Sequence, residues 1–331
     1  MLANRHRDLG LTDDQVLEMF RTMLLARKLD ERMWLLNRSG KIPFVISCQG
    51  QEAAQVGASF ALNRDIDYVA PYYRDMGIVL AFGMTANELM LSAFAKEDDP
   101  NSGGRQMPGH FGQKKNRILS GSSPVTTQVP HAVGVALAAK MEKKDFVSFV
   151  TLGEGSSNQG DFHEGLNFAG VHKLPVITMV ENNKYAISVP YERQVASKNV
   201  ADRAQGYGMP GVTVNGNDPL AVYQAVKEAR KRAAAGDGPS LIEAVSYRLT
   251  AHSSDDDDST YREKNEVDEA RKEDSIITFA NYLKEAKVLT EEAEKKLIDE
   301  IMIIINEATD LAENASYAEA EHALKYVYEE K

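Results

Sequence analysis

Two spacings of apolar residues alternate along the middle of the chain. Residues 146–152 and 176–180 form short, nearly continuous apolar runs, the pattern of strands buried on both faces of a parallel sheet. Residues 161–172, which lie between them, repeat apolar side chains at helical spacing, so the three segments predict a strand–helix–strand unit. Residues 212–214 and 241–247 predict two further strands. This alternation predicts an α/β fold with an open, mostly parallel sheet flanked by helices.

Helical spacing also dominates several segments outside this unit. A capping-box pattern, T-x-x-Q, opens a predicted helix over residues 12–38, and shorter helices are predicted over 51–62 and 86–94. Another helix should begin after Asp218, a good cap followed by proline, and end just before Gly236.

The two ends of the chain differ from its middle in composition. We expect an N-terminal helical segment (1–65), an α/β domain (66–265) and a highly charged, helical C-terminal segment (266–331). Two stretches within the middle part, 101–123 and 252–260, are polar and irregular in pattern. Long irregular segments of a compact domain are either functional or disordered, and the pattern alone leaves both readings open.

Composition and charge narrow the classes of function. The 331 residues include 38 Lys and Arg against 49 Asp and Glu, a net charge of −11 that argues against nucleic acid or an anionic membrane as the main partner. Cys48 is the single cysteine, so an intrachain disulfide and a multi-cysteine metal site are excluded. No apolar stretch has membrane-spanning length, and the N-terminal residues do not resemble a signal peptide. We therefore expect a cytoplasmic protein.

The first candidate chemistry lies in the turn GEGSSNQG, residues 153–160, directly after the first central strand. Glu154 lies in this turn, and Asn183 follows the second strand. Ligands of open parallel sheets bind at the carboxyl ends of the strands, so these side chains should meet if the strands are neighbours. Their oxygens suit Mg²⁺ or Ca²⁺, whose open positions phosphates can fill. The alternative is a glycine-rich turn with an incidental acid; a dinucleotide motif fails because Asn158 replaces its third glycine.

The wider stretch, GEGSSNQGDFHEGLNFAGVHKLPVITMVENNKYAIS, resembles the thiamine diphosphate signature, a Gly-acid-Gly turn followed by Asn-Asn at the end of the next strand. Over residues 10 to 325 the chain resembles the alpha subunits of two-chain 2-oxoacid dehydrogenases, closest to the branched-chain type. The matching blocks are PYYRDMG (71–77), GRQMPGHFG (104–112), SGSSPVTTQVPHAVGVALAAK (120–140), the signature itself, GYGMPGVTVNGND (206–218) and YRLTAHSSDDDDSTYR (247–262).

The resemblance implies a magnesium site. It assigns Glu154, the side chain of Asn183 and the backbone carbonyl of Tyr185 as Mg²⁺ ligands, with diphosphate oxygens completing the coordination. The rest of the turn, Gly153, Gly155 and Ser156, is implied to contact the cofactor.

The resemblance also implies contacts to the rest of thiamine diphosphate. Tyr73 and Arg74 match residues that contact the diphosphate, and Arg74 would supply the positive charge that an acidic protein needs there. His252 matches a loop histidine near the diphosphate and is a candidate catalytic residue, able to act as donor or acceptor near neutral pH. Ser123 and Val125 match contacts to the middle of the cofactor, with Val125 as an apolar support for its thiazolium ring.

A monovalent-cation site is a further implication. In branched-chain relatives K⁺ is held largely by carbonyl and hydroxyl oxygens, and the matching residues here are Ser122, Pro124, Thr127 and Gln128. The competing interpretation of the same residues is a tightly capped helix start.

The chain departs from the family pattern just before Asn-Asn. Branched-chain relatives often carry a basic residue there, whereas this chain has Glu181, so Arg74 would carry more of the diphosphate charge. In the acidic loop, Asp256, Tyr261 and Arg262 resemble the residues that order this loop in the family. Ser253 aligns with a regulated phosphoserine of eukaryotic relatives, and nothing in the sequence indicates a kinase that acts here.

The implied activity is oxidative decarboxylation of a 2-oxoacid, with transfer of the acyl group to lipoamide. No carboxylate suited to activating the cofactor's aminopyrimidine is found, so the resemblance implies a beta subunit that completes the site, an α2β2 heterotetramer, and docking on a dihydrolipoyl acyltransferase core. Two alternatives remain: a pyruvate or acetoin dehydrogenase alpha subunit, and a non-catalytic partner-binding protein on a degenerate thiamine fold. The preferred 2-oxoacid is not evident from the sequence.

Overall fold

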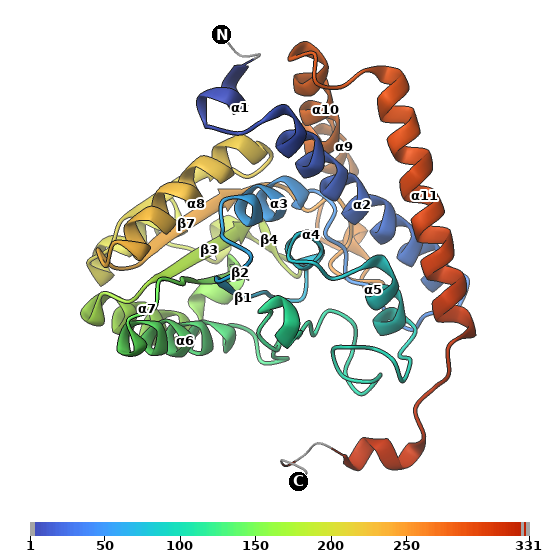
Figure 1. The fold of residues 1–331 in the computed structure, drawn as a ribbon, viewed down its shortest axis with the longest axis horizontal. Coiled ribbons are helices and arrows are strands. Elements are labelled where there is room, and N and C mark those ends of the chain that lie inside the picture. Colours follow the sequence, from blue (N-terminus) through green and yellow to red (C-terminus); the bar gives the residue numbers. More distant parts are fainter. Residues whose placement is uncertain (1–3, 326–327, 329–331) are drawn as a thin grey trace.

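The computed structural model of the chain describes residues 4–325 and 328. Its centre is one five-stranded sheet with the order β1-β2-β3-β7-β6, in which every neighbouring pair is parallel (Figure 1). The predicted open parallel sheet is therefore confirmed. In chain order its strands are β1 (Tyr68–Ala70), β2 (Ser148–Gly153), β3 (Val176–Asn182), β6 (Gly211–Asn215) and β7 (Ser240–Val245).

Helices cover both faces of this sheet (Figure 1). Because side chains alternate along a strand, Phe149 of β2 joins one hydrophobic core and its neighbour Val150 joins the other. Both central strands are buried on both faces for this reason, which explains their continuous apolar sequences. The helices of the first layer include α3 (Glu52–Phe60) and α8 (Pro219–Ala234), and those of the second are α6 (Gln128–Glu142) and α7 (Gly160–His172).

The N-terminal and C-terminal helices extend the first layer. The capping box is confirmed: Thr12 accepts from the backbone N–H of Gln15, whose side chain accepts from that of Thr12. Arg27, on the long helix that follows, forms ion pairs with Glu52 and Asp274 and so joins three helices. These outer helices are α1 (Arg5–Asp8), α2 (Asp13–Arg38), α5 (Ala86–Ala93), α9 (Lys264–Ala270), α10 (Ser275–Glu285) and α11 (Glu291–Asn314), and the short α4 (Met76–Ala81) is buried within this layer.

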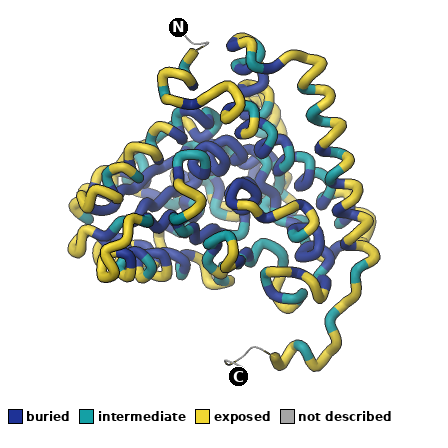
Figure 2. Tube along the Cα trace, in the orientation of Figure 1, coloured by how far each residue is buried: buried dark blue, intermediate teal, exposed yellow. Residues whose placement is uncertain are grey.

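Burial falls from the sheet outward. Figure 2 shows buried residues at the centre and exposed residues along the outer helices and the C-terminal segment. The edge strand β6 is mostly exposed, whereas all residues of β3 are buried. Within the described ranges, no helix combines the length and the apolar character needed to cross a membrane.

Some elements differ from the sequence expectations. β1 has only three residues, too few for a recognisable pattern, and α4 is buried on all sides and has no polar face. A small antiparallel hairpin, β4 (Tyr185–Ala186) with β5 (Val189–Pro190), follows the second central strand and was also not expected. β3 extends two residues beyond the apolar run, because Glu181 and Asn182 still pair with β7.

Candidate cofactor site

Glu154 and Asn183 lie at the carboxyl edge of the sheet, directly after two adjacent strands. β2 and β3 are parallel neighbours, and their register pairs Gly153 with Glu181. Each side chain therefore follows its strand at the same edge, and Oε2 of Glu154 accepts from the backbone N–H of Asn183 at 3.3 Å. The structure brings together the two residues that the sequence predicted as the centre of the site.

Glu154 is a buried carboxyl group without a cationic partner. It is 1% exposed, and its other side-chain contact is the amide of Gln194, whose Nε2 lies 3.5 Å from Oε1. Burial raises the pKa of Glu154, and hydrogen bonds and the charge of Arg248 oppose this rise only in part. Within the described part of the chain it forms no ion pair, so a bound cation would stabilise its ionised form.

Asn183 is held by bonds to all of its polar groups. Its Nδ2 donates to Oε1 of Gln51 at 3.2 Å, and its Oδ1 accepts from the backbone N–H of Tyr185 at 3.2 Å. An amide oxygen has two lone pairs, so Oδ1 retains one for a metal ion. The carbonyl of Tyr185, the third expected ligand, accepts from Nη1 of Arg248 at 3.3 Å.

The turn that carries Glu154 packs tightly against the β4–β5 hairpin. A Cβ added at Gly155 would lie 2.4 Å from the Cβ of Ala186, so only glycine fits there without a shift. Farther along the same turn, Ser157 and Asn158 accept hydrogen bonds from Arg203. These contacts hold the backbone of the turn in place from two sides.

Arg74 is a buried cation without an acidic partner. It is 2% exposed; its Nη1 donates to the carbonyl of Ser47 at 2.5 Å, and its Nη2 lies 3.2 Å from Nδ1 of His252. The guanidinium lies 5.4 Å from the ring centre of Tyr73. Its Nε has no hydrogen-bond partner, and it forms no ion pair with a described carboxylate. Such a guanidinium is suited to binding an anion.

His252 is neutral near pH 7. Burial, followed by the positive charges of Arg74 and Arg248, lowers the pKa of His252 to about 4. Because its Nδ1 accepts from Arg74, the remaining proton is assigned to Nε2. The sequence allowed His252 to act as donor or acceptor. In the structure its Nδ1 accepts from Arg74, and its Nε2–H is left to donate to another group.

Several other predicted residues surround one small cavity. Tyr73, Ser122, Val125, Gln128 and Ser156 all line it. The neighbouring Ser123 is exposed and bonds through Oγ to His110 at 2.6 Å. The cavity thus brings together residues from three blocks of the sequence.

The predicted K⁺ ligands lie in the turn that enters α6. Gln128 is the first residue of this helix, and its Nε2 donates to the carbonyl of Thr151 at 2.9 Å. Thr127 precedes it without a side-chain capping bond, so the alternative of a tightly capped helix start is only half right: the helix begins there, uncapped by a side chain. Ser122 is partly buried and Pro124 is exposed in the same turn.

Glu181, the residue that departs from the family pattern, has a side chain that is buried in the protein. It is fully buried, and its Oε2 accepts from Gln55 at 3.0 Å and lies 3.3 Å from the hydroxyl of Tyr72. The departure from the family pattern therefore places a carboxyl group in a buried polar network with Gln55 and Tyr72. Sequence reasoning missed Gln51, Gln55, Gln194 and Arg203, because no local pattern marks contacts between positions so far apart.

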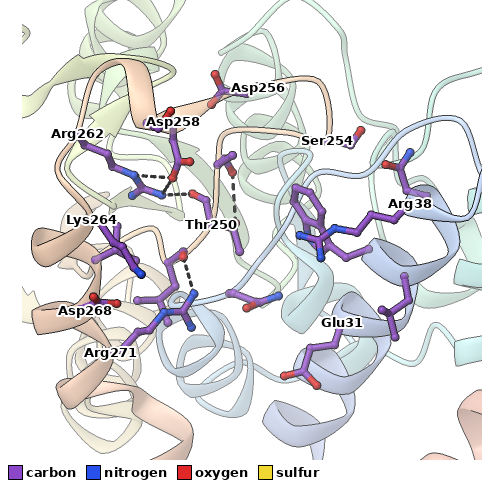
Figure 3. A pocket seen from close by; sticks show the side chains of 18 of the residues that line it. Glu31, Arg38, Thr250, Ser254, Asp256, Asp258, Arg262, Lys264, Asp268 and Arg271 are labelled. Atoms are coloured by element: carbon purple, nitrogen blue, oxygen red, sulfur yellow. Dashed lines mark hydrogen bonds and ion pairs between the residues drawn. The ribbon is translucent and has the colours of Figure 1, made fainter.

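The acidic loop is ordered by its own side chains. The hydroxyl of Tyr261 donates to Asp256, and Arg248 donates to that hydroxyl at 2.7 Å. Arg262 bonds Asp258 rather than Asp256. Figure 3 shows the hollow of about 1100 Å³ beside this loop, where charges of both signs from α2, the loop and α9 alternate. Neither Glu154 nor Asn183 lines this hollow, so its size does not make it the candidate site.

An open parallel sheet with a buried carboxyl group in the turn at its carboxyl edge is the architecture of an α/β protein that binds its ligand at that edge. The chain belongs to the family described as the dehydrogenase E1 component, whose model matches residues 20–321.

Named relatives cover almost the whole chain. The 2-oxoisovalerate dehydrogenase subunit alpha of Bacillus subtilis is 75% identical over 99% of this chain and 99% of its own length. The pyruvate dehydrogenase E1 component subunit alpha of the same organism is 38% identical over 96% of this chain and 83% of its own length. The corresponding subunit of Staphylococcus aureus strain Mu50 is 37% identical over 97% and 84%.

Proposed function

We propose that this chain is the alpha subunit of a branched-chain 2-oxoacid dehydrogenase, which decarboxylates 2-oxoacids oxidatively and transfers the acyl group to lipoamide. The difference between 75% identity to a 2-oxoisovalerate dehydrogenase subunit and 37–38% identity to pyruvate dehydrogenase subunits favours the branched-chain type.

The cofactor of this proposal is thiamine diphosphate with Mg²⁺, in keeping with the general dependence of E1 dehydrogenases on thiamine diphosphate. One observation carries it: the site has a buried carboxyl, Glu154, without a cation, and a buried guanidinium, Arg74, without an anion. A metal–diphosphate complex supplies both missing charges in one ligand. A nucleotide-type phosphate alone would leave Glu154 uncompensated.

The residues take these roles. Glu154, Asn183 and the Tyr185 carbonyl would hold the metal, and Arg74 with Tyr73 would hold the diphosphate. His252 would donate from Nε2 while Arg74 fixes its ring. When bound, the cofactor supplies the electron sink for decarboxylation, and the protein positions it and balances its charge. The remaining cofactor contacts are proposed for Ser123, Val125, Gly153, Gly155 and Ser156, and a K⁺ site for Ser122, Pro124, Thr127 and Gln128.

The proposed partner is a beta subunit, in an α2β2 heterotetramer docked on a dihydrolipoyl acyltransferase core. Apolar residues beside the site support this: Val125 is 41% exposed, and Ile187 of the hairpin loop is 57% exposed. A second subunit would cover them and close the site. Purified alone, the chain should lack decarboxylase activity, and robust turnover without the beta subunit would refute the split site.

A small apolar cavity supports a branched aliphatic substrate. Tyr73 also lines this cavity, whose other walls come from α2, α4, α5 and the loops at residues 44–46 and 108–111. An aliphatic side chain would gain from leaving water there, whereas a charged one would not. Its lining is Met33, Phe44, Val45, Ile46, Tyr73, Met76, Leu89, Ser92, Ala93, Pro108, Gly109 and Phe111.

The test is co-expression with the beta subunit, followed by rates on 2-oxoisovalerate, 2-oxoisocaproate and pyruvate. We expect the branched substrates to be preferred, and a strong preference for pyruvate would favour a pyruvate-type enzyme instead. Thiamine diphosphate and Mg²⁺ binding should disappear in Glu154→Ala. If the wild-type complex bound neither, a non-catalytic partner-binding role would replace the enzyme.

A further inference from the structure

Gln51 is a buried side chain that touches the candidate metal ligand Asn183. It precedes the first residue of α3, 132 positions before Asn183, and is 0% exposed. Its Oε1 accepts two hydrogen bonds, from the hydroxyl of Tyr72 at 3.0 Å and from Nδ2 of Asn183 at 3.2 Å. Its own Nε2 has no hydrogen-bond partner among the described residues. No described hydrogen bond joins Gln51 to Glu154, so its influence would pass through Asn183.

The two hydrogen bonds to Oε1 of Gln51 fix the orientation of the Asn183 amide, because an oxygen at this position accepts only from the nitrogen end of that amide. An asparagine amide can be rotated by a half turn at little cost in shape, which exchanges its oxygen and its nitrogen. With an acceptor oxygen at Gln51, Asn183 must direct Nδ2 to the interior. Its Oδ1 then lies on the opposite side, where Tyr185 N–H also bonds it. If the Asn183 amide were reversed, its N–H group would point at the cation, and the partial positive charge of the N–H and the charge of the cation would repel each other.

Burying Gln51 with a free Nε2 has a cost. An unsatisfied buried donor costs about 1–3 kcal/mol, so packing alone does not explain a glutamine at this position. An apolar side chain of similar length would avoid that cost. What it would lack is the acceptor that Tyr72 and Asn183 share.

We propose that Gln51 is a positioning residue that fixes the amide of Asn183 so that its oxygen faces the divalent cation. This rests on the proposed metal site. Groups that orient a metal ligand typically change metal affinity by about 10–100-fold when they are removed. Gln51 would therefore act on the metal through Asn183, to which it is hydrogen-bonded.

The experiment measures Mn²⁺, a spectroscopic substitute for Mg²⁺, bound to the complex of the full chain with its beta subunit at saturating thiamine diphosphate. Free Mn²⁺ is followed by electron paramagnetic resonance. Gln51→Met, which has similar length and no acceptor, should weaken Mn²⁺ binding by roughly 10–100-fold. Gln51→Glu keeps an acceptor oxygen and should recover most of the affinity.

Three controls separate the possible outcomes. Glu154→Gln should abolish Mn²⁺ binding; if it does not, the proposed metal site itself is wrong. Gln55→Met removes a second fully buried glutamine, which lies within α3 and makes no bond to Asn183, and it should weaken binding less than Gln51→Met. In an Asn183→Asp background, where both ends of the side chain are oxygens, Gln51→Met should have a smaller effect.

The proposal is overturned if Glu154→Gln loses Mn²⁺ while Gln51→Met binds like wild type, or if Gln55→Met is equally impaired. Should Gln51→Met fail to assemble with the beta subunit, Gln51→Glu remains decisive. Loss of Mn²⁺ affinity in that variant, with assembly intact, would equally refute a role as acceptor.

Discussion

Replacing Arg74 by Met should separate ligand affinity from stability. The guanidinium has a free Nε, and its described partners are the carbonyls of Ser47 and His252 and the neutral ring of His252. A hydrogen bond to a charged group is worth about 1.5–3 kcal/mol, so losing one to the diphosphate should weaken its binding by roughly 10- to 140-fold. Without ligand, the same change removes a buried charge that has no acidic partner, but it also removes the hydrogen bonds to Ser47 and His252. Because these effects oppose each other, we expect the free energy of unfolding to change by only about 1 kcal/mol.

The assay is calorimetric titration of thiamine diphosphate into the complex of alpha and beta subunits at saturating Mg²⁺, paired with urea denaturation of the ligand-free complex. Arg74→Lys is the matched control, because it keeps the charge but not the planar fork, and it should fall between wild type and Arg74→Met. If Arg74→Met bound the cofactor within twofold of wild type, an anion site at this guanidinium would be refuted. A large loss of ligand-free stability would instead indicate that Arg74 is chiefly structural.

Three further changes test other parts of the site. The pKa of His252 is lowered to about 4, so the folded protein resists its protonation and loses stability as pH falls from about 6.5 toward 4. His252→Gln should lack this part of the loss when the urea midpoints at pH 7 and pH 5 are compared with those of wild type. Gly155→Ala should push the turn against Ala186 and weaken Mn²⁺ binding, whereas Gly160→Ala, where a Cβ meets open space, should not; equal binding by both would contradict the tight fit. Arg27→Met leaves its two buried carboxylate partners unpaired and should cost about 3–5 kcal/mol in chemical denaturation, and an unchanged midpoint would show that they are neutral.

The sequence was sufficient where local pattern and topology coincide. The apolar runs predict β2 and β3, and the rule for parallel sheets then predicts that Glu154 and Asn183 meet at one edge, as they do. The sharp start of α8 at Asp218 is also confirmed, because a cap and a following proline act within a few residues. In each case the information lies within one strand or one turn.

The sequence was insufficient where a property depends on distant residues. Gln51 meets Asn183 only after the chain has folded, and nothing in its neighbourhood marks it as different from other glutamines of helix starts. The neutral state of His252 depends on burial and on Arg74 and Arg248, so the sequence allowed both donor and acceptor roles. The position of Glu181 inside a polar network likewise depends on Gln55 and Tyr72, which come from other elements.

The opposite charges of the site explain why such residues tolerate burial. Glu154 and Arg74 each carry a desolvation cost that no described ion pair offsets. A ligand that brings a cation to Glu154 and an anion to Arg74 would offset both desolvation costs. Part of its binding free energy would therefore come from relieving the cost of these two buried charges. Since a ligand that binds only the folded state stabilises it in proportion to its affinity, metal and cofactor together should raise the unfolding temperature of the complex more than the sum of either added alone. Equal, additive shifts would mean that the two charges are compensated independently, and the single metal–diphosphate ligand would no longer account for the pair.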